Sequence, residues 1–356
     1  MWRREAALFS SSLRRPQLQV QANSAVLGGV LEASVSSNSH YAADRFRLRA
    51  ALSSVGADVL ATANLRIEIL VGVDAGLQSL IVGLADRIDI DPIQGIVEIE
   101  GRDFCAGLIE TRIQQTFSNQ TSSEIAAGFA QGHGLLADVA QTTTPVGRYY
   151  QSQHDQVALD QFCRATTQWD LLVFLAQHEG FDVWVSGSTL HFQPAAAAVV
   201  AQTVSPSECT GFRMQRALTL ASDIEVVVKS WNSRQQRAFM QVARQSGHRS
   251  GAGRRTQRYV YVRPNLLPDQ ALQLAQRILA DLSRHERVVQ LTMPGALVLS
   301  PRSMVAIAGT GTDFDQVYQV AEIERELNVE RGFVQQVTVK NSTVASGATI
   351  PAGMAG

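Results

Sequence analysis

The hydrophobic pattern of this chain changes its period twice, and the change limits the possible folds more than any other feature. Residues 16–104 contain short runs of alternating or β-branched residues separated by Gly, Asn and Ser, which is typical of strands in a barrel or sandwich. Helical spacing follows in the middle of the chain, and strand patterns resume after a low-complexity connector at 194–202. The sequence therefore predicts an α+β, β-rich fold with an α/β region between two β regions.

Two capping boxes predict helices in the block from Gly101 to Phe192. The pattern at 121–124 opens a helix that should end near 132–134. The pattern at 167–170 opens a second helix, which Gly180 stops. The other elements expected in this block are a helix over 157–166 and a hairpin over 181–193.

The rest of the chain is mostly strand-like, with one helix. Helical spacing over 268–285, with Pro268 in the first turn, predicts that helix. The tail after residue 345 is expected to be loose. Strands are expected at 211–218, 223–231, 236–244, 288–295, 304–309, 317–330 and 333–341.

One hairpin pattern occurs in both β regions, at 79–101 and again at 317–339. In each copy one face is apolar and the other acidic, because successive side chains of a strand alternate between faces. Two related β domains would explain this similarity, and chance resemblance between charged hairpins is the alternative. The acidic residues are Asp89, Asp91, Glu98, Glu100, Glu322, Glu324 and Glu326.

These acidic faces have two interpretations. Like charges opposite each other repel, so they need water or arginine partners, for which Arg87 and Arg325 are candidates. They could form an ordinary solvated surface. They could instead line a lumen through which polyanionic DNA slides without sticking, since a basic wall would bind it.

Composition and cysteine usage exclude several classes of protein. A net charge of −1 with 45% hydrophobic residues argues against disorder and against a general nucleic-acid or membrane binder. Cys105, Cys163 and Cys209 form no paired motif, so neither a disulfide framework nor a cysteine zinc site is indicated. The amino terminus lacks the apolar run of a signal peptide. We therefore expect folding in the cytoplasm.

A search for catalytic residues gives no convincing set. His178 and Glu179 lack the second histidine of a zincin helix, and no serine lies in a GxSxG elbow. His154, Asp155 and Asp160 match no known metal-site spacing. We therefore expect no enzyme activity, no metal and no cofactor. A peptidoglycan hydrolase, which would need paired carboxylates in a cleft, remains the alternative from another class.

A basic, glycine-containing loop at 244–258 has three interpretations. It could be a solvated connection between strands, a contact for an acidic partner, or a DNA contact. It lacks interleaved aromatic residues and the third glycine of a dinucleotide-binding turn. The candidate contact residues are Arg244, His248, Arg249, Arg254, Arg255 and Arg258.

Three segments together resemble the baseplate hub proteins of tailed phages, the late control protein D group. These segments are 101–126, 142–151 and 159–192, within a block that covers about a quarter of the chain. Relatives of that group include the amino-terminal part of type VI secretion spike proteins. The resemblance depends on the overall sequence pattern of these segments, since the group has no catalytic signature.

The resemblance implies a fold, an assembly and a location. The fold is a first β-barrel domain at 1–105, an α/β insertion domain at 106–198, a second barrel domain with one helix at 199–345, and a flexible tail at 346–356. A homotrimer would place six barrels in a ring, which adapts a threefold object to a sixfold one. Expected partners are the tail tube protein, the central spike protein and other baseplate proteins. DNA would be present only in transit through the lumen, without membrane insertion. The protein would be made in the host bacterial cytoplasm and reside in the virion tail baseplate.

Overall fold

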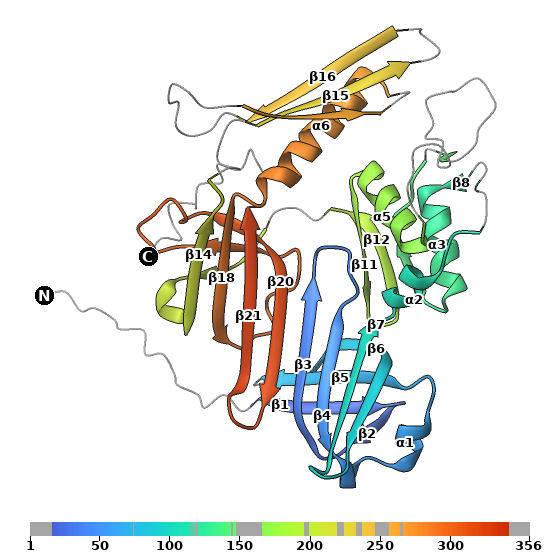
Figure 1. Ribbon diagram of the computed structural model, residues 1–356, viewed down its shortest axis with the longest axis vertical. Helices are drawn as coiled ribbons and strands as arrows, with labels where there is room; N and C mark the ends of the chain where they lie inside the picture. The colour runs from blue at the N-terminus through green and yellow to red at the C-terminus, as the bar shows by residue number, and fades with distance from the viewer. Residues whose placement is uncertain are drawn as a thin grey trace, which may run out of the picture.

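The computed structural model describes most of the chain, which is arranged around one large β-sheet (Figure 1). Strands are the commonest element and helices are fewer, so the predicted α+β, β-rich class is confirmed. The described residues are 16–73, 75–114, 117, 120–143, 145–146, 166–195, 199–218, 224–232, 237–245, 256–263 and 266–341. The predicted helix over 157–166 lies outside them except for its last residue, and the tail after residue 345 also lies outside them.

The large sheet has 13 strands and contains two β regions. The N-terminal β region consists of β1 (Gln17–Ala22), β2 (Ala25–Leu27), β3 (Val30–Asn38), β4 (Arg45–Ala51), β5 (Arg66–Val73), β6 (Ala75–Asp91) and β7 (Ile96–Asp103), with a 3-10 turn at Leu52–Ser54 and the short helix α1 (Ala57–Ala61). The C-terminal β region consists of β13 (Val200–Val204), β14 (Gly211–Arg216), β18 (Arg287–Pro294), β19 (Met304–Ile307), β20 (Val317–Asn328) and β21 (Gly332–Asn341), with a 3-10 turn at Pro206–Glu208.

The two β regions share one strand order. The N-terminal β region runs β1-β5-β6-β7-β4-β3, and the C-terminal β region runs β13-β19-β20-β21-β18-β14. They differ at one edge, because β1 is antiparallel to β5 and carries β2, whereas β13 is parallel to β19. The strands at the two ends of each order are close in the chain. Residues 23–29, which include β2, link β1 to β3, and residues 205–210 link β13 to β14. Each sheet must therefore curl around its own core.

Curling does not complete either barrel. Among the strands that the structure describes, no hydrogen-bonded pair joins β2 to β3 or β13 to β14. The N-terminal core is built from inward residues such as Leu48, Ile67 and Ile99, and the C-terminal core from residues such as Leu291 and Val337. Both regions are thus curled sheets with separate apolar interiors.

The β6–β7 and β20–β21 hairpins share a detail that sequence similarity alone could not reveal. Each first strand carries one extra residue against its partner, Asp86 in β6 and Ala321 in β20. A bulge bends its strand and increases the local twist. Each hairpin turn also ends in a glycine with positive φ, Gly95 and Gly332. The matched bulges support the interpretation of the hairpins as related.

The bulge marks the point at which β20 changes its outer neighbour. Before it, Val317–Gln319 pairs with β19, and after it, Glu322–Asn328 pairs antiparallel with β3 of the N-terminal β region. This β20·β3 joint makes the two β regions one continuous sheet.

An α/β insertion leaves the sheet at the end of β7. Its two longer helices are α3 (Ser122–Gly132) and α5 (Gln168–Glu179), and both begin with the capping boxes that the sequence predicts. Gly180 ends α5 at a φ of 75°. Its other elements are α2 (Cys105–Glu110), which the sequence analysis missed, β8 (Gln120–Thr121), β9 (Leu136–Val139), β10 (Pro145–Val146), β11 (Phe181–Ser186) and β12 (Thr189–Pro194).

A second insertion lies between β14 and β18. It is a three-stranded sheet of β15 (Ile224–Asn232), β16 (Arg237–Gln245) and β17 (Gln257–Val262), covered on one face by α6 (Pro268–Ser283). The sequence predicts these strands within the second barrel, but among the described strands they pair only with one another. The sequence also assigns residues 200–202 to a connector, whereas they begin β13. No described helix has the length and apolar character needed to cross a membrane.

Candidate functional site

The β20·β3 joint shows how one β region pairs with another. Arg325 of β20 lies opposite Val35 of β3, and both are almost fully buried, at 6% and 2% exposed. The Arg325 guanidinium donates a hydrogen bond to the Ala296 carbonyl at 3.3 Å and another to the Leu299 carbonyl. Burial lowers its pKa to about 10. The joint is therefore a packed, desolvated contact.

The corresponding part of β6 has no such neighbour. Up to Leu84, β6 pairs with β5, but beyond the bulge at Asp86 its residues pair, among the described strands, only with β7. The outer edge from Arg87 to Asp91 is thus free. Ile90, which matches the buried Arg325 by hairpin register, is 48% exposed.

A second free edge lies at the opposite end of the continuous sheet. Strand β14 pairs with β18 on one side and with no described strand on the other. By register, β14 matches β3, and Met214 matches Val35. Met214 is 38% exposed, whereas Val35 is buried. An unpaired strand edge with apolar side chains favours pairing with another strand.

The register of the internal joint can be applied to the two free edges. Applied to these edges, the β20·β3 pairing places Ile90 opposite Met214 and Asp91 opposite Arg213. Two exposed apolar side chains would cover each other, and two opposite charges would meet. Both are favourable cross-strand pairs.

All seven predicted acidic residues lie on the polar face of the continuous sheet. The first-hairpin acids are not alone there, because β4 places arginines beside them. Arg47 makes a two-point ion pair with Glu98 at 2.8 Å, and Arg87 contacts Glu100 at 2.9 Å and Asp89 at 3.1 Å. The hydrogen bonds from Arg47 lower the pKa of Glu98 below its usual value.

The second-hairpin acids have fewer charged partners. Glu322 accepts a 3.5 Å hydrogen bond from Ser36, and Glu326 lies 3.7 Å from Arg331. Arg325, expected as a partner, points to the opposite, buried face. Side chains alternate between faces along a strand, and Arg325 lies between Glu324 and Glu326. Arg87 is thus a partner as expected and Arg325 is not.

The arginines of β4 were missed by sequence reasoning, although a signal existed. The run from Arg45 to Arg49 alternates arginine with Phe46 and Leu48, which places the arginines on the polar face. What the sequence could not show is that β4 lies beside β7.

Only the ends of the predicted basic loop are described. Arg244 and Arg258 each contact Glu225 at 3.1 Å, so the two arginines share one mostly buried carboxylate. His248, Arg249, Arg254 and Arg255 lie outside the described residues. The role of the loop stays a prediction.

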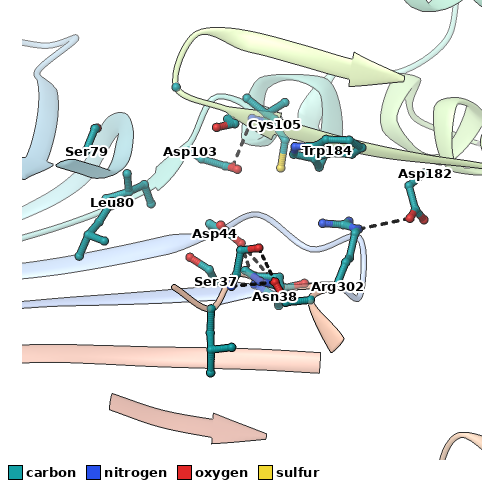
Figure 2. Close-up of a pocket in the computed structure, with 18 of the residues that line it drawn as sticks. Ser37, Asn38, Asp44, Ser79, Leu80, Asp103, Cys105, Asp182, Trp184 and Arg302 are labelled. Atoms are coloured by element: carbon teal, nitrogen blue, oxygen red, sulfur yellow. Dashed lines mark hydrogen bonds and ion pairs between the residues drawn. The ribbon is translucent and has the colours of Figure 1, made fainter. Parts of the chain in front are cut away.

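A cavity of 670 Å³ lies where both β regions and the α/β insertion meet. Figure 2 shows Arg302 beside Trp184 and paired with Asp182, with Asp44 and Asp103 nearby. The Arg302 Cζ lies 5.5 Å from the Trp184 ring centroid and 5.8 Å from that of Tyr41. These cation–π contacts tie the insertion to the β regions.

Burial disfavours the charged forms of Asp103 and Cys105, which both line this cavity. Burial raises the pKa of Asp103 to about 7, and burial also raises the pKa of the Cys105 thiol. A cysteine nucleophile needs a lowered pKa, so Cys105 is unsuited to that role. Within the described ranges, no group of three or more His, Cys, Asp or Glu side chains could hold a metal ion. His178 is mostly buried, which lowers its pKa, and His154, Asp155 and Asp160 are not described.

Comparisons with known proteins succeed only at the level of structure. No family model matches the chain, and no curated protein sequence matches it. The tail protein from Neisseria meningitidis MC58 superposes with a TM-score of 0.70 at 14% identity, covering 92% of this chain and 96% of its own. The 43 kDa tail protein of prophage MuSo2 from Shewanella oneidensis gives 0.69 at 14% identity, covering 93% and 98%.

A secretion-system protein has the same architecture. An E. coli component of the type VI secretion system, described as similar to T4 bacteriophage tail proteins, gives a TM-score of 0.51 at 11% identity, covering 91% of this chain and 76% of its own. The resemblance drawn from the sequence is therefore confirmed at the level of fold. The chain has the fold of phage tail proteins.

Proposed function

We propose that this protein is a structural baseplate hub, in which three copies form a ring of six β regions between the tail tube and the central spike. The observation that carries the proposal is the match between the β20·β3 joint and the free edges of β6 and β14. Each chain already contains one joint, and its two free edges are the halves of another. Repeating the same pairing between copies generates a ring if the rotation closes.

Three copies are the number that the tail-protein resemblance implies. Six nearly equivalent regions then surround the axis, while the insertions repeat only three times. The sixfold side would meet the tube protein and the threefold side the spike and other baseplate proteins. The virion tail baseplate is the proposed location.

The polar face of the continuous sheet is proposed to line the lumen. Its acids and arginines form pairs in the N-terminal β region, while Glu324 of the C-terminal β region has no ion pair within 4 Å among the described residues. A wall with balanced or negative charge gives DNA in transit little to bind. The structural role requires no catalytic step, cofactor or metal.

Cross-linking between copies tests the proposed pairing directly. Ile90→Cys combined with Met214→Cys should form an intermolecular disulfide under oxidation, because paired residues on adjacent strands are close enough for one. Denaturing gels without reductant should show covalent trimers, and mass measurement of the native protein should give three copies. Each single cysteine variant controls for the native thiols.

A shifted pair controls for register. Ile88→Cys with Met214→Cys places the thiols diagonally, about 7–8 Å apart, so it should cross-link far less. A monomeric protein, or equal cross-linking of both pairs, would refute the proposed ring contact.

Charge reversal tests the lumen assignment. Glu324→Lys with Glu326→Lys should leave particles assembled but reduce DNA delivery, since lysines in the wall would bind phosphates. Glu68→Lys is the control, because Glu68 lies on β5, which is beyond β6 and therefore outside the strands from β14 to β6 that are proposed to line the lumen. Normal infectivity of the double variant would argue against a DNA-lined lumen.

A further inference from the structure

The two most exposed large apolar side chains among the described residues occupy the turns of the two related hairpins. Ile93, in the β6–β7 turn, is 96% exposed, and Val329, in the β20–β21 turn, is 84% exposed. Neither side chain stabilises its own fold by burial. A single exposed aliphatic residue needs no explanation, but two at related positions of a repeated hairpin do.

Both turns project from the same end of the continuous sheet, which we call the hairpin end (Figure 1). The sheet is continuous from β6 to β14. β6 and β20 run in the same direction, because four successive antiparallel pairings, through β7, β4 and β3, connect them. Their turns must therefore lie at one end. At this end, each connecting segment joins two strands of the same β region.

The opposite end, which we call the insertion end, differs between the two β regions. There the six residues 39–44 join β3 to β4, while the equivalent strands β14 and β18 are joined by 217–286, which contains the second insertion. The α/β insertion also leaves from this end, after β7. Figure 1 shows both insertions away from the hairpin turns. Only the hairpin end presents two similar surfaces per chain.

We infer that the hairpin end is the surface that docks on a sixfold ring, with Ile93 and Val329 as its repeated apolar contacts. The inference rests on the proposed trimer. Three copies would present six aliphatic side chains at this end, alternately Ile93 and Val329. The partner with matching chemistry is a ring of six identical subunits, each with a small apolar socket, which is the tail tube protein.

The same argument assigns the other face. The insertion end repeats only three times around the axis, so it suits a threefold partner. A sixfold partner there would meet two unlike surfaces in alternation, and half of its contacts would be lost.

Photo-cross-linking in assembled particles tests the docking surface. A photoreactive residue placed at 93 in one variant and at 329 in another should cross-link the same partner, the tube protein. The same residue placed at Leu136, an exposed apolar residue of the α/β insertion, should not cross-link the tube protein. Different partners from 93 and 329, or no cross-link from either, would overturn the inference.

Binding by the intact trimer gives a second test that separates the two proposals. Ile93→Asp and Val329→Asp should each weaken binding of purified tube protein by at least about tenfold, because each removes three of the six apolar contacts of the trimer. The double variant should weaken binding further. Leu136→Asp is the matched control. If native mass shows a trimer but tube binding is unchanged, the docking inference fails alone. If native mass shows a monomer, the hub proposal fails.

Discussion

The two β regions share a backbone plan but not a surface. Matching the registers places the β4 arginines Arg47 and Arg49 where β18 has Gln290 and Thr292. In the same way, Glu98 and Glu100 of β7 occupy the positions of Gln336 and Thr338 in β21. The polar face is therefore ion-paired in one region and largely uncharged outside β20 in the other.

Their interiors differ as well, in a way that conserves volume. Phe46 lies opposite Gly101 in the N-terminal β region, and the matching pair in the C-terminal β region is Val289 with Val339. A Cβ on Gly101 would lie 2.4 Å from the Phe46 ring and 2.1 Å from the Leu84 carbonyl oxygen. A large residue and glycine thus take the place of two medium ones.

The two β regions have three features in common. These are the strand order, the bulge in the first strand of the hairpin (β6 or β20), and the hairpin turn that ends in glycine. Charges and core side chains are not common to both. The common features all concern the edges and ends of the sheet, so the edges and ends are where equivalent contacts are expected.

Truncating matched core residues should have the largest effect on the comparison. Leu48 and Leu291 occupy equivalent positions and are almost fully buried. Each leucine-to-alanine change should lower the free energy of unfolding by about 2–5 kcal/mol, from lost burial and the cavity left behind. Chemical denaturation measures both.

The number of unfolding transitions shows whether the two β regions unfold together. Since the β20·β3 joint makes one continuous sheet, both variants should unfold in a single transition shifted to lower denaturant. If Leu48→Ala shifts only one of two separate transitions, the two regions are independent units despite the joint.

Sequence reasoning succeeded where the determinants are local. The capping boxes at Thr121 and Thr167 involve residues three apart, and both helices begin there. It failed where the partner is distant in the chain. Nothing in the β15 and β16 patterns distinguishes strands of a separate small sheet from strands of a barrel, because alternation reports burial and not the neighbour.

The candidate site shows the same limit. The seven acidic residues could be assigned to one face by alternation, since that requires only period two. The free edges of β6 and β14 could not be found, because an edge is defined by the absence of a neighbour. The bulges at Asp86 and Ala321 were likewise invisible, since a bulge exists only relative to a partner strand.

A substitution that makes the N-terminal β region resemble the C-terminal one should have the next largest effect. Asp103, at the end of β7, matches Asn341 at the end of β21. Burial raises the pKa of Asp103 to about 7, so the folded state disfavours its charged form. Asp103→Asn keeps an oxygen that can accept the hydrogen bond from the Cys105 amide, now 3.3 Å.

The sign of the pH dependence follows from the raised pKa. The unfolded carboxyl titrates near 3.9, so the folded protein is favoured by this group below that pH and loses that advantage as pH rises to about 7. At pH 8, Asp103→Asn should therefore be more stable than the wild type, on the order of 2–4 kcal/mol. The difference should shrink towards pH 4. Thermal melts across this range measure it, with Asp89→Asn, an exposed carboxylate, as the control. A gain that does not vary with pH would exclude Asp103 titration as its cause.

The smallest expected effect concerns the surface charges. Glu98→Gln removes the ion pair with Arg47 at 2.8 Å, whereas Glu324→Gln removes a carboxylate with no ion pair in the described chain. Exposed pairs contribute about 0–1 kcal/mol and are screened by salt. Glu98→Gln should therefore be slightly destabilising at low ionic strength and nearly neutral at 1 M salt, while Glu324→Gln should be neutral at both. Because the pair holds the pKa of Glu98 low, its contribution is present above the usual glutamate pKa and lost as pH falls below it. Equal responses from the two variants would mean that the β4 arginines do not distinguish the two polar faces energetically, and that their value lies in neutralising the wall.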